Sequence, residues 1–243
     1  MKIFLAGTCS NREATEACNP KYVLESFYYF DDWQTVLLKN TEMFLLDSGA
    51  FTFLMKKQKG KIDFDKYVED YAAFINKHNI KYFFELDIDS VIGYENVLRL
   101  RKKLEQLTNK KCIPVWHYSR GAEAWKELCE NYDYIAIGGI ISKEIKKKQY
   151  PMMKKLIAYA HSKGAKVHGL GFTSIGLLDE YHFDSVDSTN WSFGRFGHYW
   201  VYKDGHIRMM HRPEGKKCID RNALAKFNLQ NWIQYQKWAE RNL

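Results

Sequence analysis

Residues 183–191 read FDSVDSTNW and place two aspartates, with several hydroxyl and amide groups, at the expected end of a buried strand. Asp184 and Asp187 lie three positions apart, so on a regular strand they point to opposite faces. Carboxylates in such a place suit nucleophilic or acid/base work at an electron-deficient carbon. A glycosidic C1′ is one such carbon, because one carboxylate can attack it while another group handles the proton of the departing base.

Earlier apolar runs end in similar clusters, at residues 45–49 (LLDSG), 84–89 (FELDID), 115–117 (VWH), 135–139 (IAIGG) and 167–171 (VHGLG). If these runs are parallel strands, their polar ends gather at one mouth, where enzymes of this architecture carry their active sites. Glycines at a strand end would let a flat ring lie against the backbone. The candidate residues beside Asp184 and Asp187 are Asp47, Ser48, Gly49, Asp87, Asp89, His117, Gly138, Gly139, His168 and Gly169.

Strand and helix patterns alternate through most of the chain, which predicts an α/β fold with a parallel sheet. With the run that ends at Asp47, the sequence suggests about eight strands, which favours a closed (β/α)8 TIM barrel. The open doubly wound alternative lacks a G-x-G-x-x-G turn after its first strand. No Pro/Gly/Ser-rich linker interrupts the sequence, so residues 1–243 are expected to form one domain. The expected strands are 2–7, 22–30, 81–87, 112–117, 134–138, 166–170 and the one leading to Asp187, and the expected helices are 63–78, 94–107, 122–131, 152–163 and 174–180.

The pattern changes after residue 191. Residues 199–202 and 207–210 flank an Asp-Gly turn and predict a β-hairpin, followed by a helix over 221–241. Trp191, Arg195 and Arg208 surround this hairpin and are candidates for contacting a nucleic acid, whose target base would have to leave its stack. The alternative for Trp191 is that it packs against the barrel.

Composition narrows the class of protein. The formal charge is +8, from 37 Lys and Arg against 29 Asp and Glu, which suggests a polyanionic partner such as a nucleic acid. The lysine-rich runs at 56–61 and 143–148 are interpreted as solvated faces. Five widely spaced cysteines without a C-x-x-C pair argue against disulfides and a cysteine-rich zinc site, so we expect no metal. The N-terminus reads as a strand and no apolar run could span a membrane, so a cytoplasmic protein is expected.

Four motifs, in the same order along the chain, resemble those of the tRNA-guanine transglycosylase superfamily. Residues 47–51 (DSGAF) resemble its D-S-G-[GAS]-[FY] motif, 86–88 (LDI) the L-D-I of archaeal members, and 137–140 (IGGI) its I-G-G-L. Residues 183–185 (FDS) and 186–188 (VDS) both resemble the motif that carries the nucleophilic aspartate. The resemblance covers roughly residues 43–191.

The resemblance implies a TIM-barrel glycosyltransferase in which a 7-deazaguanine displaces guanine from a nucleic acid through a covalent aspartyl intermediate at C1′, without an organic cofactor. Asp47 would handle the proton and contact the base, Asp87 would grip the base edge, and Gly138 with Gly139 would bind it through the backbone. His117 stands where bacterial members have a base-reading glutamine. The nucleophile stays open: Asp187 is favoured because it lies later on its strand, whereas Asp184 fits the bacterial spacing better.

The chain departs from the family in lacking its C-x-C-x-x-C zinc motif and in being short. It is more similar to the zinc-free transglycosylase-like proteins of phages and DNA-modification clusters, which would place it in the host cytoplasm if a phage encodes it. DNA is therefore favoured over tRNA as the polymer. Which 7-deazaguanine enters (preQ0, preQ1, queuine or a formamidino relative) stays open. Two other functions also stay open: an N-glycoside hydrolase, and a non-catalytic nucleic-acid-binding subunit that works with a partner.

Overall fold

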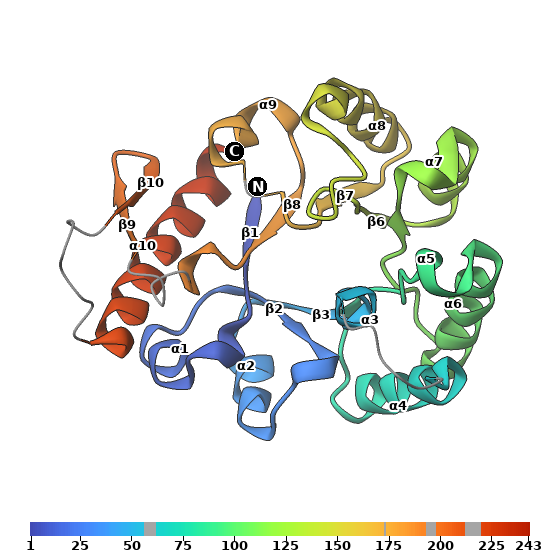
Figure 1. The fold of residues 1–243 in the computed structure, drawn as a ribbon, viewed down its shortest axis with the longest axis horizontal. Helices are drawn as coiled ribbons and strands as arrows, with labels where there is room; N and C mark the ends of the chain where they lie inside the picture. Colours follow the sequence, from blue (N-terminus) through green and yellow to red (C-terminus); the bar gives the residue numbers. More distant parts are fainter. Residues whose placement is uncertain (56–61, 173, 193–197, 212–219) are drawn as a thin grey trace.

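The computed structural model describes residues 1–55, 62–172, 174–192, 198–211 and 220–243. Eight parallel strands form one curled sheet in the order β4-β3-β2-β1-β8-β7-β6-β5 (Figure 1), which confirms the predicted parallel α/β fold. The strands are β1 (Lys2–Ala6), β2 (Tyr22–Ser26), β3 (Met43–Asp47), β4 (Tyr82–Phe83), β5 (Val115–Trp116), β6 (Tyr134–Ile137), β7 (Lys166–Gly169) and β8 (Ser185–Ser188). The expected strand over 22–30 ends early, because the chain turns into a 3-10 helix at Phe27–Tyr29.

Helices surround the sheet in Figure 1, and the five predicted between the strands are found close to their expected positions. The sequence pattern missed α1, α2, α3 and α5, which have seven residues or fewer, too short to show a helical period. No helix in the described ranges is long and apolar enough to cross a membrane. The helices are α1 (Arg12–Cys18), α2 (Thr35–Asn40), α3 (Ala50–Met55), α4 (Phe64–Lys77), α5 (Asp89–Ile92), α6 (Tyr94–Thr108), α7 (Gly121–Asn131), α8 (Tyr150–Ser162), α9 (Leu178–Tyr181) and α10 (Arg221–Asn242).

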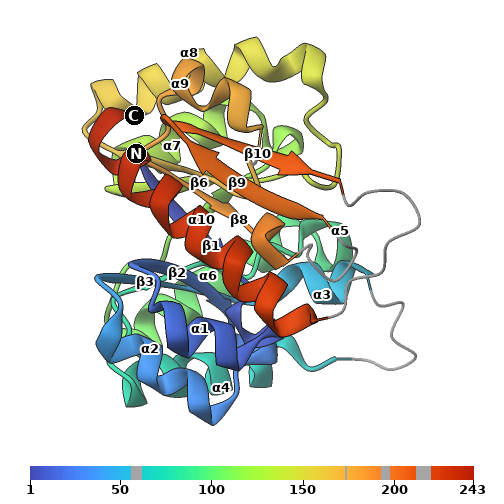
Figure 2. The same cartoon turned by 90° about the vertical axis from the view of Figure 1, so that its left-hand side faces the viewer.

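The C-terminal hairpin and helix are confirmed. Strands β9 (Tyr199–Lys203) and β10 (His206–Met210) pair antiparallel around Asp204 and Gly205, whose φ angles of 49° and 80° are those of a tight hairpin turn. Figure 2 shows the hairpin lying along α10, which crosses the side of the sheet. Gln236 anchors α10 there, because its side-chain amide donates to the carbonyls of Ile3 (2.7 Å) and Tyr22 (3.0 Å).

The two ends of the strand order meet through a short seam between the segments around β4 and β5. Phe84 and Ile113 form an isolated parallel bridge there. Regular backbone pairing ends there, and Pro114 faces the other neighbour, where its carbonyl accepts the N–H of Ala136 in β6 at 2.9 Å. Instead the Glu85 carboxylate continues the pairing, because its Oε1 accepts the N–H of Val115 at 2.8 Å. Both strands are therefore shorter than the expected 81–87 and 112–117.

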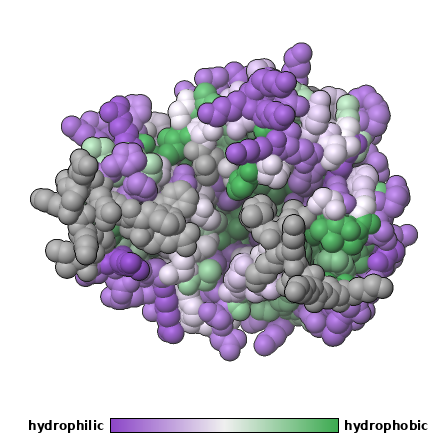
Figure 3. All heavy atoms as spheres, viewed as in Figure 1, coloured by the Kyte–Doolittle hydropathy of each residue, from purple (hydrophilic) through white to green (hydrophobic). Residues whose placement is uncertain are grey.

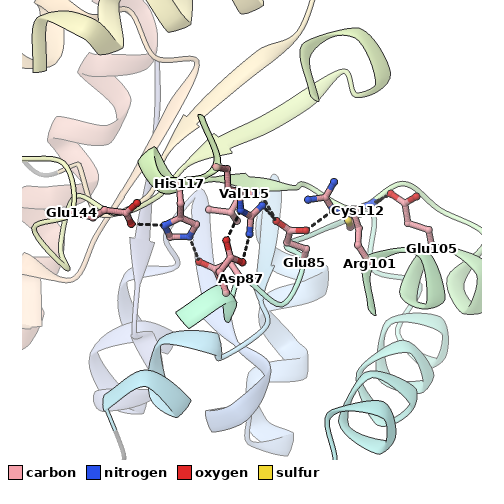
Figure 4. Close-up of polar contacts among 10 residues, drawn as sticks. Glu85, Asp87, Arg101, Glu105, Cys112, Val115, His117 and Glu144 are labelled. Carbon is pink, nitrogen blue, oxygen red and sulfur yellow. Dashed lines mark hydrogen bonds and ion pairs between the residues drawn. The ribbon is translucent and has the colours of Figure 1, made fainter. Parts of the chain in front are cut away.

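Two arginines hold Glu85 in this seam, as Figure 4 shows in part. Glu85 is fully buried and accepts hydrogen bonds from Arg101 Nε and, at 2.8 Å, from Arg120 Nη1. Arg120 also forms a fork with Asp89, with both N–H···O distances 2.6 Å. Burial alone would raise the pKa of Glu85, but the two guanidinium groups outweigh it and lower the pKa. The seam is therefore joined by an ionised carboxylate.

We expect Arg101→Met to destabilise the protein by about 3 kcal/mol, because it leaves a buried carboxylate short of a partner. Arg99→Met is the matched control: it lies two residues away on α6 and forms an exposed salt bridge with Asp65, worth about 0–1 kcal/mol. Urea unfolding of both variants measures the difference. Equal losses for the two variants would show that the seam does not depend on the buried pair.

Candidate active site

A pocket of about 290 Å³ opens at the carboxyl ends of the strands. It is lined by Asp47 at the end of β3, by Asp87 and His117 after β4 and β5, and by Asp187 on β8. Figure 3, in the same view as Figure 1, shows hydrophobic residues in a hollow near the centre of this face. The folded chain thus brings together three of the predicted acids and the predicted histidine, which come from four different strand ends.

Asp187 is held by the backbone. Its Oδ1 accepts the N–H of Gly171 at 2.6 Å and lies 3.3 Å from Nε2 of His168. His168 is itself fixed, because its Nδ1 lies 2.7 Å from the hydroxyl of Ser185. The carboxylate is 12% exposed, so it reaches the pocket while most of its surface is covered. These contacts orient Asp187 with one oxygen bound by the protein.

Asp47 has an acidity suited to proton transfer. Its Oδ2 accepts the N–H of Gly49 at 2.8 Å. Burial, with added repulsion from the charges of Asp87 and Asp187, raises the pKa of Asp47 to about 7. Gly49 makes this turn possible: its φ is +81°, and a Cβ there would lie 2.5 Å from the Cβ of Tyr28. Asp47 can therefore exist in both protonation states near neutral pH.

His117 lies between two carboxylates, as Figure 4 shows. Its Nε2 is 3.2 Å from Asp87 Oδ2 and its Nδ1 is 3.1 Å from Glu144 Oε2. Burial lowers the pKa of His117, but these two hydrogen bonds outweigh it and raise the pKa to about 10. The bond to His117 also lowers the pKa of Glu144 to about 2, helped by the N–H of Ser119 at 2.8 Å. At neutral pH His117 is a cation that donates to both acids.

Gly138 and Gly139 line the same pocket. The N–H of Gly138 donates to the carbonyl of Trp116 at 2.9 Å within the sheet, so it is not free to bind a base as expected. A Cβ at Gly138 would lie 2.9 Å from Cε1 of His117, and one at Gly139 would lie 3.0 Å from Glu144. The glycine pair therefore makes room for the clamped imidazole.

Several predicted contact residues support the pocket without being among the described residues that line it. Asp89 is bound by Arg120. Ser48 is buried, and its carbonyl accepts from the hydroxyl of Tyr67 at 2.7 Å. Gly169 packs towards Phe183, and His168 is fully buried beneath Asp187. Ser48, Gly169 and His168 are buried, so the structure does not bring them to the pocket surface, whereas Asp89 is partly exposed and its contact with substrate stays a prediction.

Asp184 lies at the opposite end of the sheet. Its carboxylate accepts the N–H of Val167 at 2.7 Å and lies 2.9 Å from His161 Nε2, and its carbonyl accepts from Lys2 at the start of β1. Asp187 lies three positions further along the chain, which corresponds to about 10 Å of extended strand. Of the two alternatives for the nucleophile, only Asp187 therefore faces the pocket.

The predicted nucleic-acid contacts divide in three. Trp191 is fully buried and its indole N–H donates to the carbonyl of Ala6 at 2.9 Å, so it is a packing residue and the prediction of stacking was wrong. Arg208 is exposed on β10. Arg195 lies outside the described residues.

Sequence reasoning missed two acids of the site: Glu25, which lines the pocket, and Glu144, which contacts His117. Glu144 lies in a lysine-rich run interpreted as solvated, and only the fold brings it to His117. Glu25 interrupts the apolar run of β2, and this charged residue inside a buried strand was the signal in the sequence that could have identified it. It is fully buried, accepts from Thr8 N and Gln34 Nε2 (both 2.7 Å), and burial raises its pKa to about 7.

Glu144→Gln is expected to lower the pKa of His117 by roughly one unit or more, because a neutral amide replaces an anionic partner. The raised pKa stabilises the folded wild type fully below about pH 6.5, the unfolded value, and this stabilisation is lost as pH rises towards 10. The variant should lose part of it at neutral pH. NMR titration of the imidazole nitrogens measures the shift, with the exposed Glu127→Gln as control. An unchanged His117 titration would contradict the clamp.

A search against protein-family models found no match for the chain, and a search of curated proteins found no match either. Any assignment of function therefore depends on the residues and their geometry.

Proposed function

We propose that this protein is a base-exchange transglycosylase that replaces guanine in a nucleic acid, DNA in preference to tRNA, with a 7-deazaguanine. The observation that carries the proposal is the meeting of Asp47, Asp87 and Asp187 in one pocket. Their surroundings differ: Asp47 can hold a proton near neutral pH, and Asp187 is oriented by a backbone N–H. Two carboxyl groups with separate roles are what displacement at C1′ requires.

The proposal includes the closed (β/α)8 barrel expected from the sequence. In its favour, the bridge between Phe84 and Ile113 joins the two ends of the eight-strand order. The position of the pocket at the carboxyl ends of the strands is also that of active sites in such barrels.

In the first step, the free oxygen of Asp187 forms a bond to C1′ of the target nucleotide. The C1′–N9 bond breaks and its electron pair goes to the guanine, which takes the proton of Asp47. Asp47 becomes a carboxylate, and its pKa of about 7 lets it supply the proton under ordinary conditions. The polymer is now attached to Asp187 as an ester.

In the second step, a 7-deazaguanine replaces guanine in the pocket. Its N9–H gives its proton back to Asp47, and the nitrogen electron pair attacks C1′ and releases the Asp187 carboxylate. Two displacements on opposite faces restore the original configuration at the sugar.

Asp87 and His117 suit the recognition of a guanine-like edge. His117 donates to one oxygen of Asp87, and carboxylate oxygens are hydrogen-bond acceptors. Such an acceptor fits the N1–H and 2-amino donors that guanine and 7-deazaguanines share. The pocket, at about 290 Å³, lies near the lower end of small-molecule sites, about 300–1,000 Å³, so we infer that a single flipped base enters it.

Asp187→Asn should abolish incorporation of radiolabelled guanine or preQ0 into polymer, with a loss of about four orders of magnitude in rate. Asp184→Asn, at the other end of the sheet, should retain activity. The assay offers duplex DNA, single-stranded DNA and tRNA separately. Absence of label in every polymer with folded wild-type protein would refute the exchange, and release of free guanine without label would favour the hydrolase.

The rate of guanine release in a single turnover should fall about tenfold per pH unit above pH 7, because Asp47 then loses the proton it must donate. Asp47→Asn should be slow and should lose this inflection. Glu25 also lines the pocket with a pKa near 7, so Glu25→Gln is the control and should keep the inflection. If the inflection disappears in Glu25→Gln instead, Asp47 is not the proton donor.

A further inference from the structure

The β9–β10 hairpin has one face packed on α10 and one face turned away from it. Trp200 and Ile207 on the inner face are buried, at 6% and 4% exposure. Side chains alternate along a strand, so Tyr202 and Met209 share the inner face with these two residues, and the remaining six residues share the outer face. The register pairs them as Tyr199 with Met210, Val201 with Arg208, and Lys203 with His206.

These six residues line a groove of about 400 Å³, which we call the hairpin groove. It is basic, because Lys203 and Arg208 lie in it and neither forms a salt bridge within the described part of the chain. Lys203 stands directly opposite His206. The acid lining the groove is Asp204, in the turn.

One end of the hairpin lies close to the pocket end of β8. The indole N–H of Trp200 donates to the carbonyl of Asn190 at 2.8 Å, and Asn190 follows the pocket end of β8. At the other end of the hairpin, Gly205 approaches Trp238, near the end of α10. Figure 2 shows the hairpin running along α10 between these two ends. The hairpin groove therefore begins, at Tyr199, next to a residue that contacts the chain following β8.

We propose that the hairpin groove binds the sugar-phosphate backbone of the nucleic acid whose target base enters the pocket. The identity of this polymer rests on the proposed function. Lys203 and Arg208 bind phosphates, and Tyr199 with Met210 offers an aromatic and apolar surface for a sugar or base. The five residues of each strand span about 14 Å, enough for several phosphates of one strand. The two basic side chains, and the position of one end of the hairpin close to the pocket end of β8, favour a nucleic acid over other partners.

The test is the salt dependence of binding, measured by fluorescence anisotropy with labelled single-stranded DNA, duplex DNA and tRNA. The double variant Lys203→Ala/Arg208→Ala should bind about tenfold more weakly or worse, and its slope of log K against log salt should be smaller by about 1.4–1.8. Lys102→Ala/Lys155→Ala is the matched control, because it removes the same charge from exposed positions on α6 and α8. The control should keep the wild-type slope.

Three outcomes would overturn the proposal. Equal slopes for the two double variants would mean that the groove does not contact the polymer. Failure of the wild-type protein to bind any of the three polymers would also overturn the proposal. Polyglutamate binding that depends equally on Lys203 and Arg208 would point to an acidic protein instead. The assay is independent of catalysis: if the proposed base exchange is wrong, label incorporation fails while this binding and its slope persist.

Discussion

The buried Glu85 carboxylate is the contact on which the site depends most. Its side chain accepts the N–H of Val115 where the regular pairing between the segments around β4 and β5 ends, and it needs Arg101 and Arg120 to remain ionised without water. Asp87 follows β4 and His117 follows β5 directly beyond this seam. Holding the two segments in register therefore also sets the distance between Asp87 and His117.

Gathering acids at one mouth is costly, and the structure offsets the repulsion in three ways. Asp47 takes a raised pKa, and so can be neutral. Asp187 receives a backbone N–H from Gly171. The positive charge of His117 lies between Asp87 and Glu144. The three solutions give the carboxyl groups different surroundings in one small space, and the proposed division between a proton donor and a nucleophile rests on this difference.

Much of the fold and part of the site could be predicted because they depend on local patterns. Apolar runs that end in Asp-Ser-Gly, Leu-Asp-Ile or Gly-Gly locate strand ends, and parallel strands bring such ends together. That was enough to predict that Asp47, Asp87, His117 and Asp187 line one pocket. It was not enough for Ser48, Asp89, Gly169 or His168, since a residue beside a strand end is turned towards or away from the pocket by packing that spacing alone does not show.

The sequence by itself determined the parallel α/β architecture, the C-terminal hairpin and helix, and the set of strand ends that carry acids, because period and turn chemistry are properties of neighbouring residues. Tertiary structure decided the rest. It placed Asp184 and Asp187 at opposite ends of one strand relative to the pocket, buried Trp191, brought Glu144 from a lysine-rich run to His117, and joined Glu85 to two arginines. Protonation states followed from that arrangement, because burial and charges from distant segments determine them and neither can be read from the order of residues.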